Sequence, residues 1–117
     1  MTSPETSLPA PASDPTSESL EPIACDLTAI PADQRPAHVA FVRTLVSRSL
    51  GAVRETADGL QFELPSDRLA DAARFVDNER RCCRHLAFML EVPPREAPLT
   101  LRVTGPGARE ELYALAG

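Results

Sequence analysis

The sequence contains no lysine and no tryptophan, and aromatic residues make up only 4% of its 117 positions. Without lysine there is no side-chain amine for Schiff-base chemistry, and all twelve basic residues are arginines. A core with so few aromatic residues has to be built mainly from leucine, valine and alanine, with four phenylalanines. The apolar content of 43% is sufficient for such a core, and the length suits one domain.

Long apolar runs and strongly basic regions are also missing. No run approaches the roughly 20 residues of a membrane helix, and the first residues lack the basic and apolar regions of a secretory signal. We therefore expect a cytoplasmic protein without a membrane partner. The net charge of −5 comes largely from residues 1–22, which hold four acidic residues and no basic one. The remainder is nearly neutral, which argues against a nucleic-acid partner.

The chain divides into two parts by composition. Residues 1–22 are rich in proline, serine, threonine and glutamate and contain few large apolar side chains. Such a segment buries too little surface to offset the entropy of ordering, so we expect a disordered acidic leader. Residues 23–117 are predicted to form a single α+β domain.

Hydrophobic periodicity predicts the element order α-ββ-α-ββ-α within this domain. The expected elements are a helix from Pro36 to about Ser49, strands at 52–56 and 60–64, a helix from about Asp67 to Cys83, strands at 86–92 and 99–104, and a last helix from Pro106 to about Leu115. This order predicts a four-stranded, mainly antiparallel sheet with the helices on one face.

A helical wheel predicts which face of the 67–83 helix points inward. The set expected to face the core is Leu69, Ala72, Ala73, Val76, Arg80 and Cys83. On that reading Cys83 points inward, whereas Cys82 lies about 100° away, at the boundary with Phe75 and Glu79. Arg80 on an inward face is unusual, because a buried guanidinium needs an anionic or carbonyl partner.

Residues 78–85 concentrate reactive groups: two adjacent cysteines, three arginines, a glutamate and a histidine. Arg80, Arg81 and Arg84 favour a thiolate, whereas the partial negative charge at a helix C-terminus disfavours one. We expect the arginines to dominate and to lower the pKa of Cys82. Consecutive side chains diverge on a helix, so the chain has to turn sharply at Arg84-His85 to bring both sulfurs to one side.

Sulfur ligands on one side would suit a soft metal or metalloid ion. Cys82 and Cys83 with Cys25 would provide three thiols for arsenite or mercuric ion, and two thiols would suit linear mercuric ion. Zinc held by a cysteine with Glu79 and His85 is a further option, although the spacing fits no zinc motif. The other histidine, His38, is expected to lie on a helix face or to support a ligand from behind.

Two other functions remain open at this point. In a thiol redox protein or enzyme, Cys82 would be the nucleophile and Cys25 or Cys83 the resolving thiol. In an interaction module the cysteines would only pack and the arginines would face a partner. An odd number of cysteines argues against a disulfide framework and for free thiols. The sequence leaves open both catalysis and a homodimer.

Three segments, Ala24–Pro31, Arg74–Cys83 and Leu101–Pro106, together resemble a family of small uncharacterised bacterial proteins with a Glu-Arg-Arg-Cys-Cys motif. Members of this family are found beside heavy-metal, notably mercury, resistance genes. The resemblance covers about residues 23–115 and departs at Arg84-His85, where the family pattern has Pro-Phe. It implies a cytoplasmic soft-metal role. The residues it matches are Cys25, Cys82 and Cys83, with Glu79, Arg80 and Arg81 as their neighbours.

Overall fold

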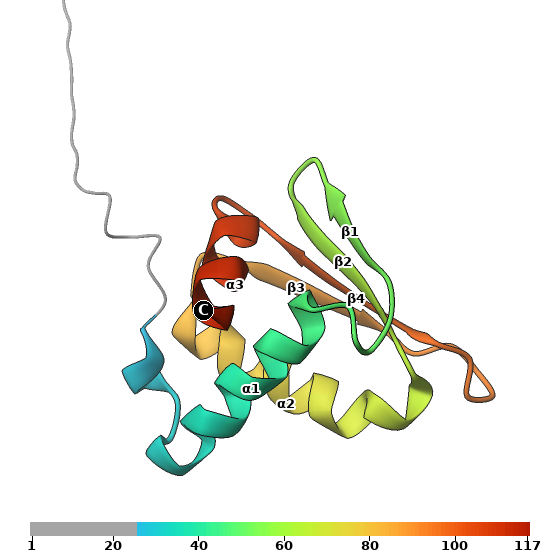
Figure 1. Ribbon diagram of the computed structural model, residues 1–117, viewed down its shortest axis with the longest axis horizontal. Coiled ribbons are helices and arrows are strands. Elements are labelled where there is room, and N and C mark those ends of the chain that lie inside the picture. The colour runs from blue at the N-terminus through green and yellow to red at the C-terminus, as the bar shows by residue number, and fades with distance from the viewer. Residues whose placement is uncertain (1–25) are drawn as a thin grey trace, which may run out of the picture.

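The computed structural model describes residues 26–117, so the predicted leader and Cys25 lie outside the described part (Figure 1). The elements in chain order are the 3-10 turns η2 (Leu27–Ala29) and η3 (Ala32–Gln34), helix α1 (Arg35–Val46), strands β1 (Val53–Thr56) and β2 (Gly59–Leu64), the turn η4 (Ser66–Arg68), helix α2 (Leu69–Cys82), strands β3 (Ala87–Glu91) and β4 (Leu99–Thr104), and helix α3 (Ala108–Ala116). The predicted α+β class and α-ββ-α-ββ-α order are confirmed.

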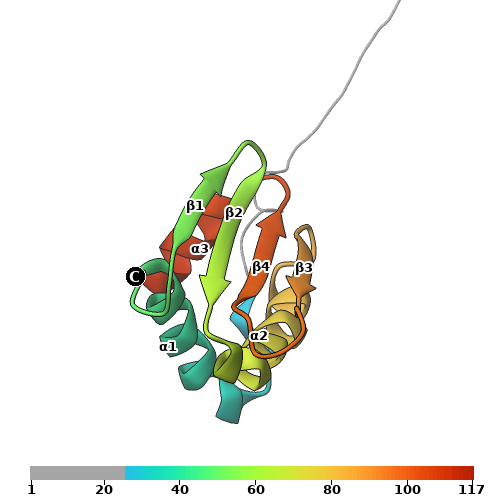
Figure 2. The same ribbon diagram turned by 90° about the vertical axis from the view of Figure 1, so that its right-hand side faces the viewer.

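The four strands form one antiparallel sheet in the order β1-β2-β4-β3. The helices cover one face of it, as expected (Figure 2). Strands β2 and β4 are central, and alternate side chains of both point toward the helices because the strand period is two residues. The buried residues of these two strands are Leu60, Phe62, Leu64, Leu99, Leu101 and Val103. This apolar layer is the platform that the helices cover, with α3 against β2, α2 against the neighbouring β3, and α1 against α3 and α2.

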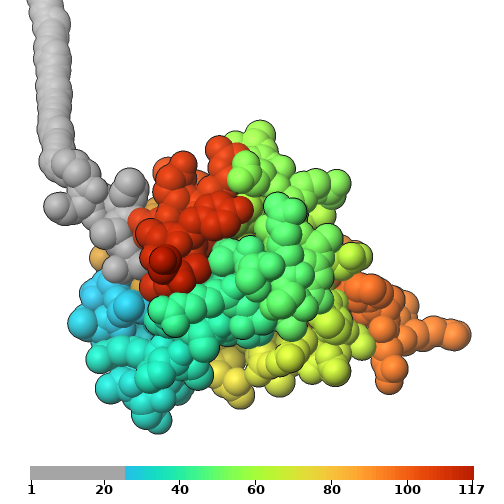
Figure 3. All heavy atoms as spheres, viewed as in Figure 1, coloured from blue at the N-terminus to red at the C-terminus, as the bar shows by residue number. Residues whose placement is uncertain are grey.

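The ends of the elements follow from local chemistry. Pro36 lies in the first turn of α1, where its missing N–H costs no helical hydrogen bond. The helix ends at Val46, earlier than predicted, and Arg48 then adopts a positive φ of 67°. Before α3, Gly107 has a φ of 73°, a conformation that glycine adopts without strain. The turn between β3 and β4 projects from the body of the molecule, at the right in Figure 3.

Helix α2 is rotated relative to the prediction. Its buried residues are Ala72, Phe75, Asn78, Glu79 and Cys82. Leu69, Ala73 and Arg80, which were expected to face the core, are exposed. Phe75 is the largest apolar side chain of the helix, and burying it removes more apolar surface from water than burying Leu69 would. The predicted wheel counted apolar residues without weighting their size, and this error also reversed the places of Glu79 and Arg80.

Candidate functional site

The two cysteines lie where α2 ends. Cys82 is the last helical residue, and Cys83 leaves the helix with φ −116° and ψ 79° while its N–H still donates to the Glu79 carbonyl at 2.7 Å. This change of direction brings the two Sγ atoms to 3.9 Å from each other, although consecutive side chains on a continuous helix would diverge. The sharp turn expected after the cysteines is therefore present, and both sulfurs lie on one side.

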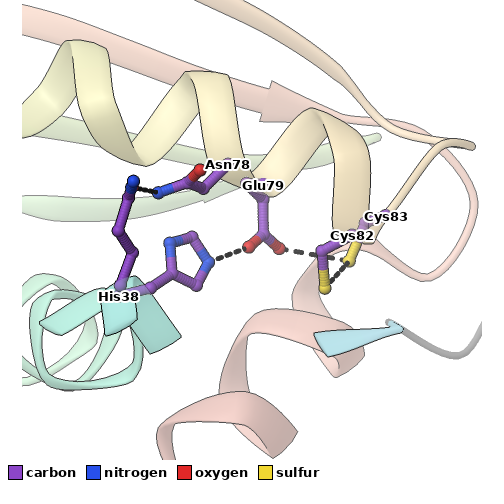
Figure 4. Close-up of polar contacts among 6 residues, drawn as sticks. His38, Asn78, Glu79, Cys82 and Cys83 are labelled. Carbon is purple, nitrogen blue, oxygen red and sulfur yellow. Dashed lines mark hydrogen bonds and ion pairs between the residues drawn. The ribbon is translucent and has the colours of Figure 1, made fainter. Parts of the chain in front are cut away.

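Glu79 lies one turn before Cys83 and connects the sulfurs to α1 (Figure 4). Its side chain is fully buried. One carboxylate oxygen, Oε2, lies 3.2 Å from Cys83 Sγ, and the other, Oε1, lies 2.6 Å from His38 Nε2. A buried carboxylate is costly unless it is paired. His38, itself only 4% exposed, provides that partner.

The orientation of His38 is fixed from two directions. Its ring stacks on Phe75 with a centroid separation of 5.5 Å and an interplanar angle of 11°. Phe75 is held in turn by the edge-on ring of Phe88, at 6.1 Å and 82°. The imidazole is thus clamped between an aromatic face and the Glu79 carboxylate. His38 lies on the inner face of α1, buried against Glu79. Its contact with Glu79 was not predicted, because the two residues are 41 positions apart in sequence.

Three side chains in the described part of the chain could hold a metal ion together: Glu79, Cys82 and Cys83. Their ligand atoms all lie within 4.8 Å of one another, and all three residues are buried. His85 is not a member of this group, so the zinc option that used it finds no support. The Nε2 atom of His85 is itself buried without a hydrogen-bond partner among the described residues.

The two sulfurs differ in oxidation state. Cys82 is a free thiol, whereas Cys83 is disulfide-bonded. The expectation that the thiols are all free is therefore wrong for Cys83. In this state Cys83 has no S–H, and its 3.2 Å approach to Glu79 is a contact between sulfur and oxygen rather than a donated hydrogen bond. Coordination of a metal by Cys83 thus requires its prior reduction.

Cys25 lies outside the described residues, and its membership of the sulfur cluster stays a prediction. The described chain begins next to it, at Asp26, whose N–H donates to the Cys82 carbonyl at 3.0 Å. This hydrogen bond holds Asp26 against the end of α2.

The expected lowering of the Cys82 pKa is wrong. Burial raises the pKa of the Cys82 thiol to about 12, and the negative charge of Glu79 acts in the same direction. Cys82 is only 3% exposed, so its predicted position at the boundary is wrong as well. Arg80 and Arg84 are exposed, and Arg81 pairs with Asp77 at 3.3 Å. Water screens the positive charge of these guanidiniums, so they stabilise a Cys82 thiolate only weakly. Glu79 is buried together with the thiol, so its negative charge acts on Cys82 with little screening.

Comparison with known proteins adds no relative. No protein-family model matches the chain, and neither a curated protein nor a solved structure matches it. Within residues 26–117 no helix combines the length and apolar character needed to cross a membrane. The cytoplasmic location, the absence of a nucleic-acid partner and a homodimer stay predictions, and so does the resemblance to the family found beside mercury-resistance genes.

Proposed function

We propose that the protein, with Cys83 reduced, binds a thiophilic metal or metalloid ion such as Hg(II) or As(III). Cys82 and Cys83 would provide two thiolates and Glu79 a carboxylate oxygen. The observation that carries this proposal is the convergence of these three ligand groups within 4.8 Å at the end of α2. His38 would hold Glu79 in place through its 2.6 Å contact, as second-layer partners of metal ligands commonly do.

The burial of the site favours soft ions. Two thiolates and the Glu79 carboxylate balance the charge of a trivalent ion such as As(III), and with a divalent ion such as Hg(II) they leave one negative charge, next to His38. A charge-balanced complex costs far less to bury than a free charge. Each thiol has to lose its proton before it binds, and the raised pKa of Cys82 makes that loss unfavourable. Only ions that form strong bonds to sulfur compete well with the proton there, which selects against hard cations such as magnesium and calcium.

The distance between the sulfurs favours a bent complex. Two sulfurs bound to one tetrahedral ion at about 2.3 Å each lie about 3.8 Å apart. The observed separation is 3.9 Å. A linear complex with the same bond length would need about 4.6 Å. A three- or four-coordinate ion with Glu79, or with Cys25 as a third sulfur, therefore fits with less movement than the linear mercuric complex considered from the sequence.

The test is a titration of the reduced protein with Hg(II) and As(III) against a competing low-molecular-weight thiol. We expect one ion per chain, and a loss of at least about 100-fold in affinity for Cys82→Ser and for Cys83→Ser. Cys25→Ser reports whether a third sulfur takes part, and Arg81→Ala is a matched control on the same helix with its ion pair in solvent. Unchanged affinity in both the Cys82 and the Cys83 variant would end the proposal.

The disulfide at Cys83 supports a second candidate, a thiol redox protein. The reactive residue would then be Cys83, because the raised pKa of Cys82 makes Cys82 a poor nucleophile. By elimination Cys25 would be the partner within one chain, since Cys82 is free. A low-molecular-weight thiol would reduce this bond to two thiols and be oxidised to its own disulfide. Mass spectrometry after alkylation would show two newly labelled cysteines, and Cys25→Ser would abolish the disulfide in the monomer.

A further inference from the structure

A cavity of about 280 Å³ lies between α1 and α2. Its apolar lining comes from Ala37, Ala40, Phe41 and Phe75, and its polar lining includes His38 and Asn78. The Phe41 and Phe75 rings are tilted by 51° with their centroids 5.8 Å apart, so two aromatic side chains border the same space. A mostly apolar hollow with a few polar groups is the usual form of a small-molecule site, and this volume is close to the lower limit of about 300 Å³ for such sites.

One atom of the lining residue His38 has no protein partner. The Nδ1 atom is buried and makes no hydrogen bond to any described residue. Its other ring nitrogen, Nε2, is engaged by Glu79 at 2.6 Å. In the tautomer whose Nε2–H donates to the Glu79 carboxylate, the other ring nitrogen presents a lone pair at Nδ1. A buried acceptor without a hydrogen bond is unfavourable, so a ligand with a donor group would satisfy this atom.

The other polar side chains around the cavity each make at least one hydrogen bond or ion pair, including the bond from Thr44 Oγ1 to the Ala40 carbonyl at 2.9 Å. Asn78 Nδ2 donates to Gln34 Oε1 at 2.9 Å. Arg74 pairs with Asp71 at 3.4 Å, so the charges bordering the cavity nearly cancel. These pairs leave no isolated charge to attract an ion. What the cavity offers is aromatic surface and the unpartnered Nδ1 atom of His38.

From this combination we propose that the cavity binds a small, uncharged aromatic molecule carrying an O–H or N–H group that donates to His38 Nδ1. The ring would lie against Phe41 and Phe75, and the donor would satisfy the buried nitrogen. This site is distinct from the sulfur cluster, which lies on the other side of Glu79 (Figure 4). The proposal does not depend on metal binding.

The experiment uses phenol as the probe and toluene as its matched control, because toluene has a similar shape but no donor. Binding is followed on the metal-free full-length protein by ¹H–¹⁵N correlation spectra of the histidine side chains. We expect phenol to bind with a Kd of roughly 1 mM, a value reasonable for seven heavy atoms. Phenol should shift the His38 Nδ1 resonance, and toluene should bind at least about 5-fold more weakly without that shift.

Two variants test the location. Ala40→Phe fills the cavity from an exposed lining position and should weaken phenol binding at least about 10-fold. Ala73→Phe places the same side chain at an exposed position of α2 outside the cavity and should leave binding unchanged. Equal binding of phenol and toluene, an unshifted Nδ1 resonance, or full binding by Ala40→Phe would overturn the proposal. The affinity of Ala40→Phe for Hg(II) and As(III) should equal that of the wild type. A failure of the cavity proposal can therefore be told apart from a failure of the metal proposal.

Discussion

The sheet side and the helix side of the core are equally buried but differ in chemistry. On the sheet side Leu60, Phe62, Leu101 and Val103 are at most 1% exposed and entirely apolar. On the helix side the buried residues include every buried polar or charged group of the described chain, namely His38, Asn78 and Glu79, with Cys82 beside them. An apolar core needs no such groups. Their accumulation at one interface places the groups that can carry chemistry on the helix side and leaves the sheet side purely apolar.

Phe62→Ala should show the largest loss of stability on the sheet side. Removal of this fully buried ring leaves a cavity and should cost about 3–5 kcal/mol in the free energy of unfolding. Urea denaturation measures this cost. The metal affinity of the molecules that remain folded should not change. A parallel loss of metal affinity would show that the two sides are not separate in function.

Glu79→Ala should cost a similar amount on the helix side, about 3–5 kcal/mol, because it leaves His38 buried without its partner. Unlike the change in the sheet, it should also weaken Hg(II) and As(III) binding by about 10–100-fold, the range found when metal-site partners are lost. Glu79→Gln keeps an oxygen acceptor and the side-chain volume, and should lose less stability. If Glu79→Ala bound metal like the wild type, Glu79 would be only a structural partner of His38.

Alkaline pH should destabilise the protein through Cys82. Below pH 9 the folded and unfolded chains both keep the thiol proton, and between pH 9 and about 12 only the folded chain keeps it. The folded state then binds more protons, so stability falls as pH rises through this window. At 1.36 kcal/mol per pKa unit the loss is at most about 4 kcal/mol. Urea denaturation at several pH values measures this loss of unfolding free energy. Cys82→Ala should lose less stability at alkaline pH than the wild type, which separates the Cys82 contribution from that of other titrating groups. Identical pH profiles of the two proteins would contradict the prediction.

Arg81→Ala should have the smallest effect. Its ion pair with Asp77 joins two side chains that are about half exposed, and such pairs contribute about 0.2–1 kcal/mol. We expect a change of roughly 0.5 kcal/mol or less in stability and no measurable change in metal affinity. A marked fall in affinity would restore the role that the sequence suggested for the arginines beside the cysteines.

The sequence predicted most of the architecture because strand and helix periods are local properties. The bounds of β4, Leu99–Thr104, match the prediction, and the alternation of Leu60, Phe62 and Leu64 in β2 correctly identified the buried face. A period of two residues leaves only two choices of face, and here one is clearly apolar. For α2, several rotations about the helix axis bury similar numbers of small apolar residues. Periodicity alone therefore did not identify the buried face of this helix.

The sequence by itself determined the element order, the antiparallel sheet and the concentration of cysteine and glutamate near residue 80. Only the tertiary structure decided that Glu79 and Cys82 are buried and Arg80 is not, and that His38 lies against Glu79. The reason is that propensity and periodicity act over a few residues. The Glu79 carboxylate pairs with an imidazole 41 positions away, and the pKa of the Cys82 thiol depends on the burial that this packing creates. Both depend on which helices the sheet brings together.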